Sequence, residues 1–123
     1  MGRELGELLR SIRLEKSLSQ RELASRVGVH HTYISKIEAG KERPSQEKVK
    51  AIAQALETDT IRLELAAGYL PAEFARVVAQ KPEIRRLLEL AACGRLSESA
   101  YQTLKELLDR EDRVNVPVWL EHG

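Results

Sequence analysis

The fold is decided by the stretch SQRELASRVGVHHTYISKIEAG, residues 19–40. Ser19 followed three residues later by Glu22 is typical of a capping box, in which each side chain bonds the other residue's amide at a helix start. Apolar residues then recur at helical spacing until Gly28, which gives the backbone the freedom that a tight turn needs. A second pattern of the same period ends at Gly40. The stretch therefore predicts two short helices joined by a tight turn.

Further helices are predicted on both sides of this stretch, because apolar residues there recur every three or four positions. Five short helices with brief connections account for the chain up to Gly68, and three more follow. The apolar stripes outside the opening stretch are Leu5, Leu8, Leu9 and Ile12; Val49, Ile52, Ala53 and Leu56; Ile61, Leu65 and Ala66; Phe74, Val77 and Val78; Ile84, Leu87, Leu88 and Ala91; and Leu104, Leu107 and Leu108. No segment before residue 113 alternates like a strand, so we expect an all-α fold.

The charge of the chain is nearly balanced but unevenly distributed. The 123 residues carry a net charge of +1, with 32% charged and 42% hydrophobic residues, a composition typical of a globular protein. Residues 1–50 hold eleven Lys and Arg against seven Glu, a net charge of +4, so the remainder is acidic. A basic N-terminal part favours contact with phosphate, although helical proteins also show so mild an asymmetry by chance.

Several classes of protein and site are not expected from this sequence. Cys93 is the single cysteine, which leaves no disulfide framework and no zinc cluster. No apolar run approaches the roughly 20 residues of a membrane span, and the N-terminus lacks a signal-peptide core, so we expect a cytoplasmic protein without membrane contact. No pair of nucleophile and base stands out, so we expect neither an enzyme nor a bound metal or cofactor.

Two short helices around a tight turn form the helix-turn-helix arrangement, whose second helix enters the major groove of DNA. The arrangement needs a small residue where the two helices cross, and Ala24 supplies it. Val29 and Ile34 are spaced to anchor the turn and the second helix to the core. Because these positions carry suitable residue types, the sequence predicts a DNA-binding module.

In this region the sequence resembles the phage repressor and Cro family of helix-turn-helix domains, often called the Xre family. The resemblance runs from about Leu5 to Ala67. It rests on Gln20-Arg21-Glu22-Leu23-Ala24, on Gly28-Val29, on Tyr33-Ile34-Ser35-Lys36-Ile37-Glu38-Ala39-Gly40 and on Arg43-Pro44-Ser45. It implies a compact five-helix, repressor-like bundle that binds operator DNA as a dimer.

The resemblance also implies a set of DNA contacts. The residues expected to read base edges are His31, Thr32 and Lys36, and those expected to contact phosphate are Gln20, His30, Tyr33, Lys41 and Arg43. Arg13 and Glu38 match a pair that forms a salt bridge between the first and third helices of the family. The alternative for the charged and amide side chains is a solvated surface position. For Tyr33 the alternative is packing, with its hydroxyl at the surface.

Two positions depart from the family pattern. His30 stands where Ser or Thr usually caps the DNA-reading helix, so we expect either a looser helix start or a side chain directed at phosphate. Ala39 replaces the Arg or Asn common at that position, so one side-chain contact with the backbone is expected to be missing. Because His30 and His31 are adjacent at the DNA-facing end, binding is expected to tighten as the pH falls through about 6.5.

The chain beyond Gly68 is expected to mediate self-association. We place the DNA-binding domain at 1–68, a helical C-terminal dimerisation region at 69–112 and an extended tail at 113–123. A closed two-fold dimer is the commonest oligomer. The leucines expected at the dimer interface are Leu87, Leu88, Leu104, Leu107 and Leu108. The alternative is that these stripes pack only on their own chain.

These observations favour a transcriptional regulator, in the first place a repressor, that reads the major groove of a palindromic double-stranded operator as a homodimer. The alternative is an antitoxin or partner-controlled regulator whose C-terminal helices bind another protein. Both share the same DNA-binding domain, so they differ in what covers the apolar stripes beyond Gly68.

Overall fold

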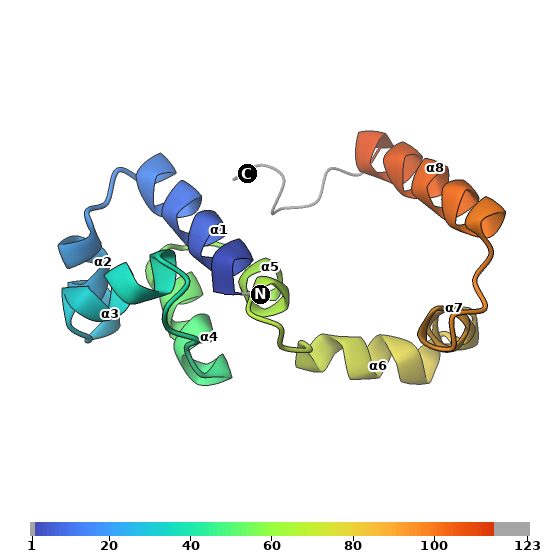
Figure 1. Ribbon diagram of the computed structural model, residues 1–123, viewed down its shortest axis with the longest axis horizontal. Coiled ribbons are helices and arrows are strands. Elements are labelled where there is room, and N and C mark those ends of the chain that lie inside the picture. Colours follow the sequence, from blue (N-terminus) through green and yellow to red (C-terminus); the bar gives the residue numbers. More distant parts are fainter. Residues whose placement is uncertain (1, 115–123) are drawn as a thin grey trace. The chain divides into compact units, whose positions relative to one another are not determined.

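The computed structural model describes residues 2–114, and its eight helices in this range, without any strand, confirm the predicted all-α class (Figure 1). None of the helices described is long and apolar enough to cross a membrane. Two compact units are divided at the bond between Leu70 and Pro71. The first contains α1 (Gly2–Glu15), α2 (Gln20–Val27), α3 (His31–Glu38), α4 (Gln46–Ala55) and α5 (Thr60–Ala66); the second contains α6 (Ala72–Gln80), α7 (Pro82–Ala92) and α8 (Glu98–Val114).

The capping box at Ser19 closes the N-terminus of α2. The Ser19 hydroxyl accepts a hydrogen bond from the Glu22 amide at 3.0 Å, and the Glu22 carboxylate accepts one from the Ser19 amide at 2.9 Å. The bond to the Ser19 backbone is the main cause of a lowered pKa at Glu22. At the other end of α2, Gly28 adopts a left-handed conformation with φ of 86°, which costs glycine little and turns the chain toward α3.

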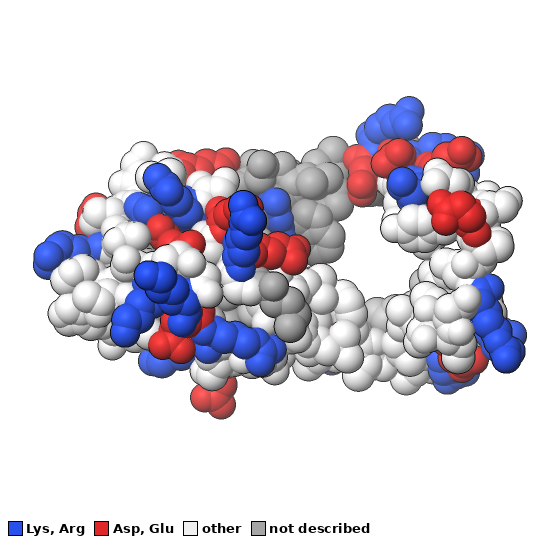
Figure 2. Space-filling view, in the orientation of Figure 1, with Lys and Arg blue, Asp and Glu red and all other residues white. Residues whose placement is uncertain are grey.

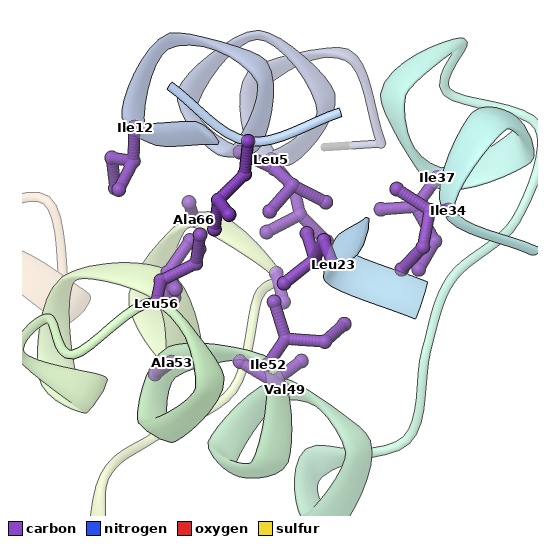
Figure 3. Close-up of a cluster of buried hydrophobic side chains, with 14 of the residues drawn as sticks. Leu5, Ile12, Leu23, Ile34, Ile37, Val49, Ile52, Ala53, Leu56 and Ala66 are labelled. Atoms are coloured by element: carbon purple, nitrogen blue, oxygen red, sulfur yellow. The ribbon is translucent and has the colours of Figure 1, made fainter. Parts of the chain in front are cut away.

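An apolar core holds the first unit together. Among the described residues, the hydrophobic side chains of this core all lie between Leu5 and Ala67, and Pro71 is buried as well. Figure 3 shows that labelled side chains from all five helices of this unit point into the same space. Helices this short are marginal in water by themselves, so burial of their apolar stripes, at roughly 1.5–3 kcal/mol for each large side chain, is what stabilises them.

Helices α1 and α3 approach closely at Gly6, a position that the sequence did not single out. A Cβ atom at Gly6 would lie 2.4 Å from the carbonyl oxygen of Glu38 and 2.7 Å from that of Ile37. Both oxygens belong to the backbone of α3, which cannot yield unless the two helices move apart. Gly6 therefore permits the approach that brings Arg13 of α1 within reach of α3.

The helices of the second unit leave their apolar faces uncovered. None of α6, α7 and α8 contains a buried residue, although α6 packs against α7. Leu88 of α7 and Leu108 of α8 expose 51% and 52% of their surface. Figure 2 shows few charged side chains along α6 in the face that it presents. The second unit is therefore rich in apolar surface without a core of its own.

Helix α8 extends further than the sequence predicted. Residues 113 and 114, assigned above to an extended tail, belong to this helix. Charged residues from Asp109 to Arg113 are compatible with a helix, and the alternating apolar pattern begins only at Val114. The rest of the predicted tail, 115–123, lies outside the described residues.

Candidate nucleic-acid interface

Helix α3 has a buried side and an exposed polar side. Ile34 and Ile37 are completely covered by the core, and α3 packs against both α2 and α1. Thr32 and Lys36, one helical turn apart, are exposed to solvent. The apolar stripe therefore fixes the helix while its polar side chains stay accessible, as the helix-turn-helix arrangement requires.

A buried polar network ties α3 to both preceding helices. The Arg13 guanidinium of α1 donates from Nε and Nη2 to the two carboxylate oxygens of Glu38, at 2.6 and 3.0 Å. The side chains of this ion pair are only 9% and 6% exposed. Gln20, at the start of α2, donates from Nε2 to Glu38 at 3.1 Å, and Arg13 also donates to the Leu18 carbonyl at 2.8 Å. The hydrogen bond to Glu38 raises the pKa of Arg13 above its usual value.

His30 caps the N-terminus of α3. Its Nδ1 accepts a hydrogen bond from the Thr32 amide at 3.2 Å and lies 2.8 Å from the Thr32 hydroxyl. The sequence predicted a poor cap at this position, whereas the imidazole replaces the usual hydroxyl with a ring nitrogen. Because that nitrogen must offer a lone pair, the cap depends on an unprotonated Nδ1.

His31 begins α3 directly beside this cap. Its ring centroid lies 4.4 Å from that of His30. Partial loss of water around the ring lowers the pKa of His31, and the positive charges of Arg21 and of a protonated His30 lower it further. Arg21 is exposed on the first turn of α2 and was not among the predicted contacts, although it lies within the opening stretch. A phosphate near these groups would relieve the repulsion among them.

The predicted phosphate contacts beyond α3 differ in their surroundings. Lys41 is exposed, and its amide donates to the Lys36 carbonyl at 2.8 Å in the turn that ends α3. Tyr33 is half-buried against the core, and burial raises the pKa of its hydroxyl, with Glu42 and Tyr69 adding to the shift. Of these two, Lys41 is the side chain freely accessible to a ligand.

Arg43 is exposed, but its guanidinium is bonded to other residues of the first unit. Its Nε donates to the Ala67 carbonyl at 3.0 Å, and its guanidinium carbon lies 4.1 Å from the centre of the Tyr69 ring. The sequence placed Arg43 among the phosphate contacts and did not single out Tyr69, whose partners lie more than twenty residues earlier in the chain.

Side chains suited to a metal ion do not gather in the part of the chain that the structure describes, which has no cluster of three or more His, Cys, Asp or Glu of that kind. Cys93 is exposed at the end of α7, outside the first unit.

Replacing Glu38 with Gln tests the buried network. The variant leaves the Arg13 charge buried without its partner, so we expect a loss of about 3–5 kcal/mol in the free energy of unfolding. Urea denaturation measures this change. The control is Glu7→Gln, which breaks the Arg3–Glu7 pair whose side chains are 90% and 70% exposed, and it should cost less than about 1 kcal/mol. Equal losses in both variants would contradict a special role for the buried pair.

The lowered pKa of His31 predicts that the free protein becomes less stable in mild acid. Because the pKa of His31 is lowered in the folded protein, the unfolded chain binds more protons below about pH 6.5, and the free energy of unfolding falls there. Thermal unfolding at about pH 7.5 and 5.5 should show a smaller acid shift in His31→Gln than in the wild type. An unchanged shift in this variant would refute the prediction.

Comparisons with known proteins agree with this geometry. Residues 9–63 match the helix-turn-helix family model. An HTH-type transcriptional regulator of Mycobacterium tuberculosis is 38% identical over 73 residues, which cover 58% of this chain and 52% of the regulator, so the chain spans about half the length of this relative. The immunity repressor protein of Bacillus phage phi105 is 28% identical over 118 residues, covering 85% of this chain and 82% of the repressor.

A solved structure is also similar. The clp gene regulator ClgR from Corynebacterium glutamicum is 30% identical, with a TM-score of 0.50, over 74% of this chain and 94% of ClgR. The named relatives are regulators of transcription, not enzymes. With the packing of α2 and α3, these matches show that the chain belongs to the helix-turn-helix family of the Xre, phage repressor and Cro type.

Proposed function

We propose that the chain is a sequence-specific transcriptional regulator that binds double-stranded DNA and acts as a repressor. The observation that carries the proposal is the division of α3 into a buried stripe, Ile34 and Ile37, and an exposed polar side. A helix held in this way presents its side chains in fixed positions to base edges in the major groove. The phage immunity repressor among the relatives supports repression. Such a regulator would work in the cytoplasm, and catalysis is no part of the proposal.

The exposed side of α3 is assigned to base reading. Lys36 is suited to donate to O6 and N7 of a guanine. The Thr32 hydroxyl lies against His30, so the methyl group of Thr32 suits contact with a thymine methyl. His31, at the helix start, is suited to a base or to a nearby phosphate.

The groups that flank α3 are assigned to contacts with the phosphate backbone of DNA. The amide end of α2 is attractive to a phosphate, because its unpaired N–H groups and its dipole point outward there. Gln20 gives one N–H of its amide group to Glu38 and keeps a second for a phosphate oxygen. Lys41, just beyond the C-terminal end of α3, supplies a positive charge for a phosphate of either DNA strand.

The second unit is assigned to self-association. In the described structure Leu87 and Leu104 are half-buried, whereas Leu88, Leu107 and Leu108 are exposed by 44–52%. A second copy would cover these faces and place two α3 helices on half-sites about 34 Å apart, as a palindromic operator requires. The same uncovered faces also suit a protein partner, which is the alternative occupant.

Selection of bound duplexes from random DNA tests the proposed function. We expect the enriched sequences to contain two inverted half-sites whose centres lie about one helical turn apart. A single enriched half-site would favour a monomer or a partner-dependent regulator. A pool with no enriched sequence would refute sequence-specific binding.

Replacing Lys36 or Lys41 with Ala separates base reading from phosphate contact. Lys36→Ala should lower affinity for the selected duplex by about 1–3 kcal/mol and relax one base position. Lys41→Ala should weaken binding to selected and random duplexes alike and reduce the slope of log affinity against log salt by about 0.9. Titrations at several salt concentrations measure both effects. If Lys36→Ala weakened both duplexes equally, its assignment to base reading would be wrong.

Truncation after Leu70 tests the role of the second unit. The truncated chain should remain folded, because the buried hydrophobic core of the described residues lies between Leu5 and Ala67. It should sediment as a monomer and bind the selected duplex about 100-fold more weakly, because the two half-sites are no longer linked. Circular dichroism, sedimentation and titration provide the readouts. A truncated protein that still sediments as a dimer would place the interface in the first unit.

A further inference from the structure

The loop that follows α3 is held by the end of the first unit. Residues 41–45 have no helical structure, and the chain reaches α4 only at Gln46. Residues 67–70 form the short segment that leaves α5. Although about 25 residues separate these two segments in sequence, side chains join them at several points.

Arg43 makes the first connection. Its Nε–H donates to the carbonyl of Ala67, the C-cap residue that directly follows α5, at 3.0 Å. The last carbonyls of a helix lack partners within the helix and carry partial negative charge, so a guanidinium is favoured there. The same guanidinium lies over the ring of Tyr69, with 4.1 Å between its central carbon and the ring centre, a cation–π contact.

Tyr69 and Gln46 complete the connection. The Tyr69 hydroxyl donates to the carbonyl of Pro44, in the middle of the loop, at 2.7 Å. Gln46 donates from Nε2 to the Leu70 carbonyl at 3.3 Å and to a carboxylate oxygen of Glu64 at 2.7 Å. Glu64 is only 1% exposed, so a buried carboxylate holds the side-chain amide of Gln46.

We propose that Arg43, Gln46, Glu64 and Tyr69 form a clasp that positions the loop 41–45 for contact with DNA. In this role Arg43 is a positioning residue and not a phosphate ligand, while Lys41 provides the charge that meets the phosphate. The clasp fixes the loop because two side chains of opposite segments each bond the other segment's backbone: Arg43 bonds Ala67 and Tyr69 bonds Pro44. This inference rests on the proposed DNA-binding function.

The test compares Arg43→Lys, Tyr69→Phe and their double variant with Lys41→Ala. Affinity for the selected duplex is titrated at salt concentrations from about 50 to 200 mM. Arg43→Lys keeps the charge but loses the planar guanidinium, and Tyr69→Phe loses only the hydroxyl. Each single variant should weaken binding about threefold to tenfold without changing the slope of log affinity against log salt. The loss of affinity in the double variant should be smaller than the product of the two single losses, because both variants break the same connection. Lys41→Ala should reduce the slope.

A phosphate-binding Arg43 would give the opposite pattern. Arg43→Lys would then keep nearly wild-type affinity, Arg43→Ala would reduce the salt slope by about 0.9, and Tyr69→Phe would have no effect. That pattern would overturn the clasp. If the wild-type protein bound no duplex, the proposed function would be refuted. The clasp would then be decided by hydrogen exchange in the protein without DNA.

Amide hydrogen exchange examines the clasp without DNA. In Tyr69→Phe, exchange should speed up at the Lys41 amide, which bonds the Lys36 carbonyl at the start of the loop, whereas amides in α1 and α4 should keep their wild-type rates. Unchanged exchange in the loop would overturn the inference. Faster exchange throughout the first unit would overturn it as well, since the hydroxyl would then support the whole fold and not the loop.

Discussion

One buried ion pair, Arg13 with Glu38, sets how the first three helices of the first unit meet, because it adds a directional contact to the apolar core that these helices share. Two charges removed from water carry a large desolvation cost, which is offset only when every polar atom finds a well-placed partner. The planar guanidinium meets both carboxylate oxygens, and further hydrogen bonds join Gln20 to Glu38 and Arg13 to the Leu18 carbonyl. Such a network specifies one arrangement of α1, α2 and α3, and the absence of a side chain at Gly6 lets the helices come close enough to form it.

Fixed geometry at α3 extends to both of its ends. The apolar stripe and the ion pair hold the helix body, the His30 imidazole holds its first turn, and the turn at Gly40 brings the Lys41 amide onto the Lys36 carbonyl at its last turn. The exposed side chains of α3 are thus displayed from a rigid support, which lowers the entropy lost when they bind.

The two units use apolar residues in opposite ways. In the first unit Leu, Ile and Val side chains from five helices share a core, whereas the stripes of α6, α7 and α8 remain at the surface of the described chain. Leaving so many large side chains in water is unfavourable, and a binding partner that covers them would recover that energy. Stability of the first unit and the proposed association through the second therefore depend on different residues of the same chain.

The sequence by itself determined the helices, the capping box at Ser19, the turn at Gly28 and the division of α3 into an apolar and a polar side, since these features depend on residues within about one turn of each other. Tertiary structure decided the rest. The sequence paired Arg13 with Glu38 only through resemblance to a family, and it did not indicate why Gly6 must lack a side chain. It also did not indicate that the Arg43 guanidinium bonds the Ala67 carbonyl, because contacts between segments so far apart in sequence exist only after the helices have packed.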